Sequence, residues 1–134
     1  MKDVIYYAHS KKIYGTKREV KERAFLEKTF VKVCCPNRDI GERGDIEPYL
    51  EMVRKCTKVI CSEYLNHIGK GVFAEVQEAL NKKKLVFCLK RYRANYYLVP
   101  VEGVEVFDEY DWKVFYGRLI LKKIKAKIRP KISK

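Results

Sequence analysis

Segments with the pattern of strands alternate three times with segments that have the pattern of helices over the first 81 residues. The strand-like segments are residues 3–9, 30–35 and 58–62, and helices are expected at about 16–29, 45–55 and 72–81. Alternation of this kind is typical of a parallel sheet with right-handed crossovers. We therefore predict an α/β fold, a doubly wound, flavodoxin- or Rossmann-like sheet with helices on both faces.

The rest of the chain adds two strands and a helix. A fourth strand is expected at residues 85–89 and a fifth at 96–99 and 104–107, with a break at Pro100 and Gly103. A C-terminal helix is expected to begin near Glu109. A chain of 134 residues has room for one such domain. We assign residues 1–121 to a single domain with a mainly parallel, five-stranded sheet, and residues 122–134 to a basic tail.

The net charge of +13 is concentrated at the C-terminal end of the chain. Residues 118–134 hold eight basic residues and no acidic one, so without them the charge is 13 − 8 = +5. A basic run of this kind is either a solvated tail or a weak contact to nucleic acid or phospholipid. Both alternatives stay open.

The five cysteines form no Cys-x-x-Cys pair, and four of them lie inside predicted strands. Cysteine in such positions behaves as a small apolar residue. The adjacent Cys34 and Cys35 should point to opposite faces of a strand, which prevents joint ligation. We expect reduced, mostly buried cysteines, no metal site and no cofactor. The apolar runs are too short to span a membrane, and the start of the chain lacks the pattern of a signal peptide, so a cytoplasmic protein is expected.

The topology itself predicts where a ligand binds. In doubly wound sheets the ligand lies beyond the carboxyl ends of the strands, where the strand order reverses. This rule selects the loops that begin at His9, Asn37 and Glu63, which are also rich in polar residues and glycine. We expect a site built from these loops.

The loop before the third helix has features of an anion site. Gly69 and Gly71 flank Lys70 there, and a helix N-terminus offers free N–H groups to a phosphate. The P-loop and dinucleotide-binding patterns are both missing from the sequence. Glu75 follows on the same helix, and we expect the positive end of the helix dipole to keep it ionised. A fixed carboxylate of this kind suits a nucleophile, or a group that stabilises a developing positive charge.

Several short motifs, in order, resemble the nucleoside 2-deoxyribosyltransferase superfamily. They are Ile5-Tyr-Tyr-Ala-His-Ser10, Asn37-Arg-Asp39, Val59-Ile-Cys-Ser-Glu63 and Gly69-Lys-Gly-Val-Phe-Ala-Glu-Val-Gln-Glu-Ala79. In length the chain is most similar to the 2′-deoxynucleoside 5′-phosphate N-hydrolase branch. The resemblance implies an enzyme acting on an N-glycosidic bond, and a homodimer or larger homo-oligomer.

The resemblance also implies roles for particular residues. Glu75 takes the place of the nucleophile that attacks C1′ of the sugar, Tyr6 that of the family's tyrosine, and residues 10–15 that of the loop that holds the 5′-phosphate. The family's catalytic aspartate falls near Tyr49, which is not acidic. Glu47, Glu51 or the earlier Asp45 could take its place, and Glu47 is the one we name. The predicted catalytic residues are thus Glu75, Tyr6 and Glu47. The predicted substrate-binding residues are His9, Ser10, Lys12, Gly15, Asn37, Arg38, Glu63, Gly69, Lys70 and Gly71.

Three functions remain open at this point. The first is an N-glycosidase or deoxyribosyltransferase that acts on a nucleoside or its 5′-monophosphate. The second is a nucleotide-binding module of the same fold without turnover, since the family's aspartate is missing. The third is a nucleic-acid-binding protein that uses the basic tail.

Overall fold

The computed structural model describes residues 3–41, 44–65 and 68–103. Its elements in chain order are β1 (Val4–His9), the 3-10 helix η1 (Lys11–Ile13), α1 (Lys17–Thr29), β2 (Lys32–Cys34), α2 (Pro36–Asp39), α3 (Glu47–Lys55), β3 (Lys58–Ser62), α4 (Lys70–Asn81), β4 (Leu85–Tyr92) and β5 (Asn95–Val101). The strand predicted at 104–107, the helix predicted from Glu109 and the basic tail lie outside the described residues. In the described ranges, no helix combines the length and the apolar character that crossing a membrane requires.

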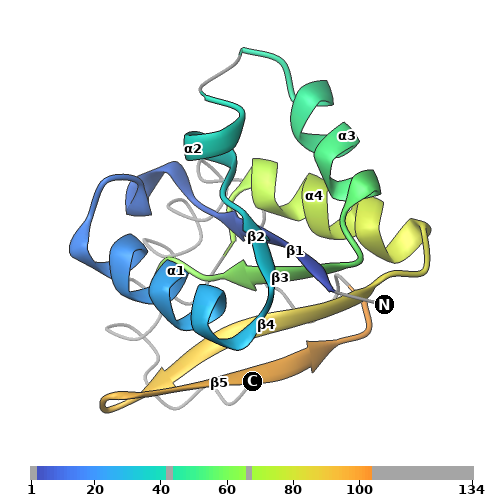
Figure 1. Cartoon of the computed structure of the whole chain (residues 1–134). Coiled ribbons are helices and arrows are strands. Elements are labelled where there is room, and N and C mark those ends of the chain that lie inside the picture. The colour runs from blue at the N-terminus through green and yellow to red at the C-terminus, as the bar shows by residue number, and fades with distance from the viewer. Residues whose placement is uncertain (1–2, 42–43, 66–67, 104–134) are drawn as a thin grey trace, which may run out of the picture.

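The five strands form one sheet in the order β2-β1-β3-β4-β5 (Figure 1). β2, β1, β3 and β4 run parallel to one another, and β5 is antiparallel to β4. β1 lies in the middle of the parallel part, as its nearly continuous apolar sequence predicts. Its last residue, His9, pairs with Ser62 at the end of β3, so the carboxyl ends of these two strands meet at one edge of the sheet.

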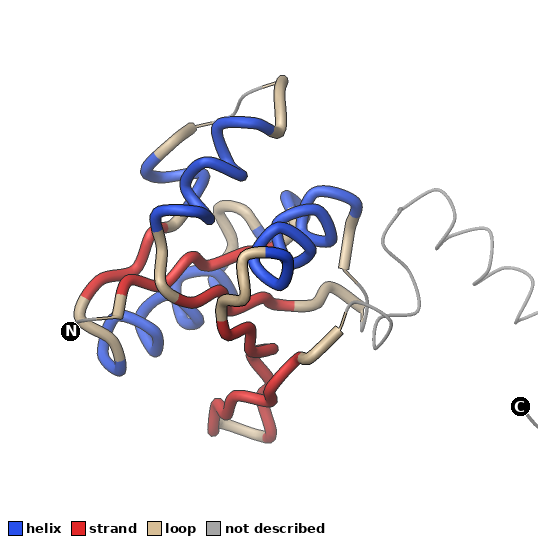
Figure 2. Tube along the Cα trace, turned by 90° about the vertical axis from the view of Figure 1, so that its right-hand side faces the viewer, coloured by secondary structure: helices blue, strands red, loops and turns tan. Residues whose placement is uncertain are grey.

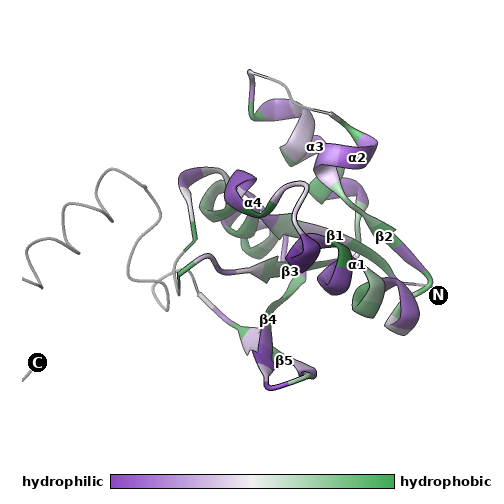
Figure 3. Ribbon diagram, turned by 90° about the vertical axis from the view of Figure 1, so that its left-hand side faces the viewer, coloured by the Kyte–Doolittle hydropathy of each residue, from purple (hydrophilic) through white to green (hydrophobic). Residues whose placement is uncertain are grey.

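Helices cover both faces of the parallel strands. On one face α1 packs Leu26 against Tyr7 and Ile60, and on the other α3 and α4 pack Val53 and Val76 against the sheet. In Figure 3 the central strands are largely green and α2 is purple, as expected for an apolar sheet between helices with hydrophilic outer surfaces. The α/β architecture and the mainly parallel, five-stranded sheet predicted from the sequence are confirmed.

Several local features differ from the prediction. The segment after β2 was expected to be a loop, but Pro36–Asp39 forms the short helix α2, because proline is well suited to a first helical turn. α4 begins at Lys70, two residues earlier than predicted. β5 continues through Pro100 to Val101 instead of breaking there, since an edge strand tolerates proline.

The hairpin of β4 and β5 extends away from the helices (Figure 2, red strands at the bottom). β4 ends at Tyr92, three residues beyond the predicted end. Residues 90–92 pair with β5 alone, so the parallel part of the sheet ends at Leu89. Tyr92 and Tyr97 of this hairpin are exposed.

Candidate functional site

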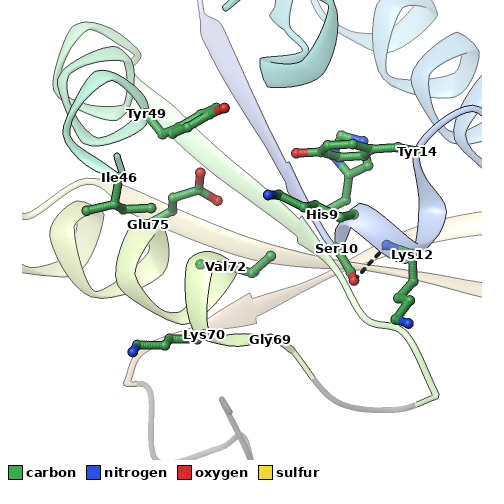
Figure 4. Close-up of a pocket in the computed structure, with 12 residues that line it drawn as sticks. His9, Ser10, Lys12, Tyr14, Ile46, Tyr49, Gly69, Lys70, Val72 and Glu75 are labelled. Atoms are coloured by element: carbon green, nitrogen blue, oxygen red, sulfur yellow. Dashed lines mark hydrogen bonds between the residues drawn. The ribbon is translucent and has the colours of Figure 1, made fainter. Parts of the chain in front are cut away.

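A cavity of about 330 Å³ lies beyond the carboxyl end of β1, between the segment that follows β1, the start of α3 and the first turns of α4 (Figure 4). This volume lies at the lower end of the range for small-ligand sites. It is lined by His9, Ser10, Lys11, Lys12, Tyr14, Ile46, Tyr49, Gly69, Lys70, Gly71, Val72 and Glu75. The cavity lies where the topological rule predicts a ligand.

Glu75 is the single carboxylate among these lining residues. It is only 6 % exposed, and its Oε2 accepts a hydrogen bond from the hydroxyl of Tyr6 at 2.5 Å. Tyr6 is itself fully buried, and burial raises the pKa of its phenol, so it remains a donor at all ordinary pH values. The predicted catalytic residues Glu75 and Tyr6 therefore form one buried pair.

The protonation state expected for Glu75 is wrong. Burial raises the pKa of its carboxyl to about 8, although the Tyr6 hydrogen bond acts in the opposite direction. Glu75 is the sixth residue of α4, and the field of a helix terminus fades within the first turn. Loss of solvation is therefore the larger effect, and it favours the protonated form of Glu75.

His9 lines the cavity, but both of its ring nitrogens contact residues that are not among those lining it. Nδ1 lies 3.0 Å from the carbonyl oxygen of Tyr7, and Nε2 lies 2.6 Å from a carboxylate oxygen of Glu19. The ring stacks on Tyr7 with centroids 3.8 Å apart. Burial lowers the pKa of His9. His9 thus forms a fixed wall of the cavity.

Basic side chains and backbone N–H groups surround the cavity on the side of η1 and α4. Ser10 caps η1 by accepting a hydrogen bond from the backbone N–H of Lys12 at 3.1 Å. The residue at the N-cap of α4, Gly69, has no side chain that could cap the first N–H groups of that helix. Together with the ammonium groups of Lys12 and Lys70, they make a surface suited to an anion.

Two carboxylates named from the sequence lie away from the cavity. Glu47 is exposed and forms an ion pair of 2.8 Å with Arg54. Glu63 is tied to Lys90 at 2.5 Å, next to the β4 strand. Neither is among the residues that line the cavity, so the structure does not bring Glu47 or Glu63 together with Glu75.

Three more of the predicted binding residues have structural roles. Arg38 pairs with Glu27 and Asp39 on the outer surface. Asn37 accepts a hydrogen bond from the thiol of Cys35 at 3.1 Å. Gly15 has a positive φ of 73°, a conformation that favours glycine, and follows the segment that lines the cavity. None of the three is among the lining residues.

Sequence reasoning missed two tyrosines that line the cavity. Burial raises the pKa of Tyr14, so its hydroxyl stays protonated. The hydroxyl of Tyr49 donates a hydrogen bond to the carbonyl oxygen of Gly41 at 2.6 Å. Figure 4 shows both hydroxyls pointing toward the part of the cavity that the Glu75 carboxylate faces. In the sequence, Tyr49 stands out only because the family's aspartate falls near it.

No protein-family model matches the chain, and neither a curated protein nor a solved structure matches it. The function is therefore argued from the geometry of the cavity.

Proposed function

We propose that the protein is an N-glycosidase or deoxyribosyltransferase that acts on a nucleoside or its 5′-monophosphate, with Glu75 as the nucleophile. The observation that carries this proposal is the buried Glu75–Tyr6 pair at the base of a cavity of small-ligand size. A carboxylate held in a poorly solvated place and aligned by one strong donor is suited to attack an electrophilic carbon.

In this proposal the ionised carboxylate of Glu75 forms a bond to C1′ of the sugar while the bond from C1′ to the base nitrogen breaks. The bonding electrons leave with the base, which takes up a proton from water or from a lining hydroxyl. Tyr6 donates to the carboxylate and fixes its orientation. Water, or a second base, then forms a bond to C1′ while the bond from C1′ to Glu75 breaks. The bonding electrons return to the carboxylate, and the proton of the attacking group passes to solvent. A glycosidic reaction commonly uses a second carboxyl group; here Tyr14 and Tyr49 are the polar groups available near the leaving base.

The anion-binding side of the cavity supports a phosphorylated substrate. Lys12, Lys70 and the N-terminus of α4 supply positive charge around the cavity. We therefore place the sugar over Glu75, the 5′-phosphate near Lys12 and Lys70, and the base against Tyr14.

A second candidate is a nucleotide-binding module without turnover. It is favoured by the presence of a single carboxylate at the cavity and by Tyr49 at the position where the resemblance implies an aspartate. The two candidates share the ligand and differ in whether the base is released.

One experiment separates them. Purified protein is incubated with a panel of deoxynucleoside 5′-monophosphates and nucleosides, and free base is measured by chromatography. Release of a base is expected, and it identifies the preferred base as well. Thermal stabilisation by a nucleotide without base release would favour the binding module. If the nucleotides caused neither base release nor stabilisation, both candidates would be contradicted.

The finer features of the fold belong to the same proposal. The strand order and the helices on both faces support a doubly wound, flavodoxin-like topology. The resemblance adds a homodimer or larger homo-oligomer, and a cytoplasmic location is part of the same proposal.

The pH dependence of the reaction follows from the pKa of Glu75. Because attack requires the carboxylate, kcat/KM should rise about tenfold per pH unit below the pKa of the free enzyme and level off above it. The inflection is expected near pH 8. The measurement is kcat/KM from about pH 6 to about pH 10. A rate that falls over this range would mean that Glu75 acts in its protonated form.

Tyr6→Phe tests the hydrogen bond to Glu75. Loss of the donor removes the interaction that lowers the pKa of Glu75, so the inflection should move to higher pH. At neutral pH the rate should fall by about tenfold for each unit of that movement.

Tyr7→Phe is the matched control for this variant. Tyr7 donates a hydrogen bond of the same length, 2.5 Å, to the buried Glu22 on the opposite face of β1. Its loss disturbs the fold in a similar way but leaves Glu75 alone, so the inflection should stay near pH 8. An equal movement in both variants would contradict the role of Tyr6.

A further inference from the structure

Three side chains of the kinds that bind metals meet next to the cavity. Nε2 of His9 lies 2.6 Å from Oε2 of Glu19, and Sγ of Cys35 lies 4.0 Å from the same oxygen. All three ligand atoms lie within 4.8 Å of one another, and the three residues are buried. In the ranges that the structure describes, they are the one group of this kind.

Each ligand comes from a well-packed part of the fold. His9 ends β1, Glu19 lies in the first turn of α1, and Cys35 follows β2, the neighbour of β1 in the sheet. Tyr7, which packs beneath them, is fully buried. Ligands carried by strands and helices hold their positions better than ligands on loops.

The surrounding hydrogen bonds orient the ligand atoms. The carbonyl oxygen of Tyr7, at 3.0 Å, can only accept, so Nδ1 of His9 carries a hydrogen and Nε2 points into the cluster. The other oxygen of Glu19 accepts from the backbone N–H of Gly15 at 3.0 Å. Metal-binding histidines and carboxylates are typically held by such outer partners.

The spacing of the ligand atoms is close to what zinc requires. Bonds of about 2.0 Å to nitrogen and oxygen and about 2.3 Å to sulfur place tetrahedral ligand atoms roughly 3–4 Å apart. The distance between Cys35 and Glu19 lies within this range, whereas the distance between His9 and Glu19 must widen by about 0.7 Å, a rotation of one carboxylate. The sulfur of Cys35 and the ring nitrogen of His9 lie within 4.8 Å of each other.

We propose that His9, Glu19 and Cys35 form a binding site for a divalent metal ion of the zinc type. The mixture of imidazole, carboxylate and thiolate suits Zn²⁺ and, among common ions, disfavours Mg²⁺ and Ca²⁺.

The binding of Zn²⁺ leaves the total charge of the three ligands and the metal unchanged: two protons leave as one divalent ion enters. The short contact between His9 and Glu19 holds one shared proton, and the thiol of Cys35 holds another. Zn²⁺ replaces both, and the two protons pass to solvent, so the summed charge of the three ligands and the metal stays zero. The guanidinium of Arg23, which hydrogen-bonds the sulfur of Cys35, keeps its charge beside them. A buried site can accept such an exchange because no net charge is left without a partner. The side-chain oxygen of Asn37, which accepts the hydrogen bond of the thiol, lies close enough to offer a fourth ligand.

The metal would connect the ends of β1 and β2 to α1 through the wall that His9 forms in the cavity. We therefore expect Zn²⁺ to raise the melting temperature of the full-length protein by binding the folded state. This consequence does not depend on the reaction proposed for Glu75.

Cobalt provides the test, because Co²⁺ occupies zinc sites and gives a charge-transfer absorption when a thiolate is among its ligands. Reduced, metal-free protein is titrated with Co²⁺ and then with Zn²⁺. The expected result is one Co²⁺ per chain, a thiolate-to-cobalt band, and its loss when Zn²⁺ displaces the cobalt. A wild-type protein without this band would overturn the proposal.

Two cysteine variants locate the site. Cys35→Ser should lose the band and bind Zn²⁺ about 100-fold more weakly. Cys34→Ser is the matched control, since Cys34 is adjacent in sequence but packs on the opposite face of the sheet, and its band should be unchanged. The reverse pattern would overturn the assignment.

Circular dichroism shows whether the Cys35→Ser protein folds. If it does not, Glu19→Gln takes its place. That variant keeps the shape of the side chain, retains the thiolate band and should bind Zn²⁺ at least about tenfold more weakly. An unchanged affinity would contradict the site.

Discussion

Replacement of Glu75 by glutamine is expected to reduce base release by about 1,000-fold or more, the size of effect seen when a catalytic nucleophile is lost. Glutamine has the same shape and can still accept the hydrogen bond of Tyr6, so the cavity should keep its form. It cannot form the bond to C1′. The measurement is kcat/KM for the preferred nucleotide, taken near pH 9, where Glu75 of the wild-type protein is ionised.

Glu47→Gln is the control for this experiment. Glu47 is also a helical glutamate and was the second catalytic candidate, but it pairs with Arg54 on the surface. Its replacement should leave kcat/KM within about twofold, because the loss of an exposed ion pair has little effect on the fold. If Glu47→Gln abolished base release and Glu75→Gln did not, the catalytic role of Glu75 would be refuted.

The same Glu75→Gln variant is expected to be more stable than the wild type at alkaline pH, by a few kcal/mol in the free energy of unfolding. The pKa of Glu75 is about 8 in the folded protein, against 4.5 for the unperturbed group. The folded state therefore holds this proton more tightly than the unfolded state. Wild-type stability should fall as the pH rises from about 4.5 to about 8, and the glutamine variant lacks this loss.

Urea unfolding of both proteins at several pH values measures the difference. The two stabilities should be similar near pH 4.5, and the advantage of the variant should grow until about pH 8 and then stay constant. A variant that is less stable than the wild type at pH 9 would show that Glu75 is solvated or paired when ionised. A gain in stability with a loss of activity is the expected mark of a residue kept for function.

Much of the fold could be predicted because buried parallel strands have continuous apolar sequences. The predicted bounds of β3, residues 58–62, agree with the structure. The start of the helix expected at about residue 16 is also confirmed, because Thr16 is the N-cap of α1. Thr16 accepts the hydrogen bond of the Glu19 N–H, but the Glu19 side chain turns to Gly15 and His9. A sequence pattern predicts the helix start, whereas the tertiary partner decides where a side chain points.

The candidate site was predicted to the extent that backbone topology determines it. His9, Ser10, Lys12 and Glu75 meet at the cavity because their segments follow β1 or begin α4. Glu63 does not line the cavity, because its carboxylate forms an ion pair with Lys90, on a strand distant in sequence.

The part that could not be predicted depends on side-chain direction. Tyr14 and Tyr49 look like ordinary aromatic residues in the sequence, and only the packing of α3 near the end of β1 brings them to one cavity. The raised pKa of Glu75 has the same origin, since burial is a property of the assembled fold.

The central claim is that Glu75 attacks C1′ of a nucleotide, and trapping the resulting glycosyl-enzyme tests it most directly. When the substrate is a nucleotide with fluorine at C2′, the second step, which releases the sugar from Glu75, is slow. The sugar should therefore stay on the protein. Peptide mapping by mass spectrometry should find one added sugar phosphate on the carboxylate of Glu75, with one base released per chain. Base release with the sugar on another residue, or with unmodified protein throughout, would contradict the claim.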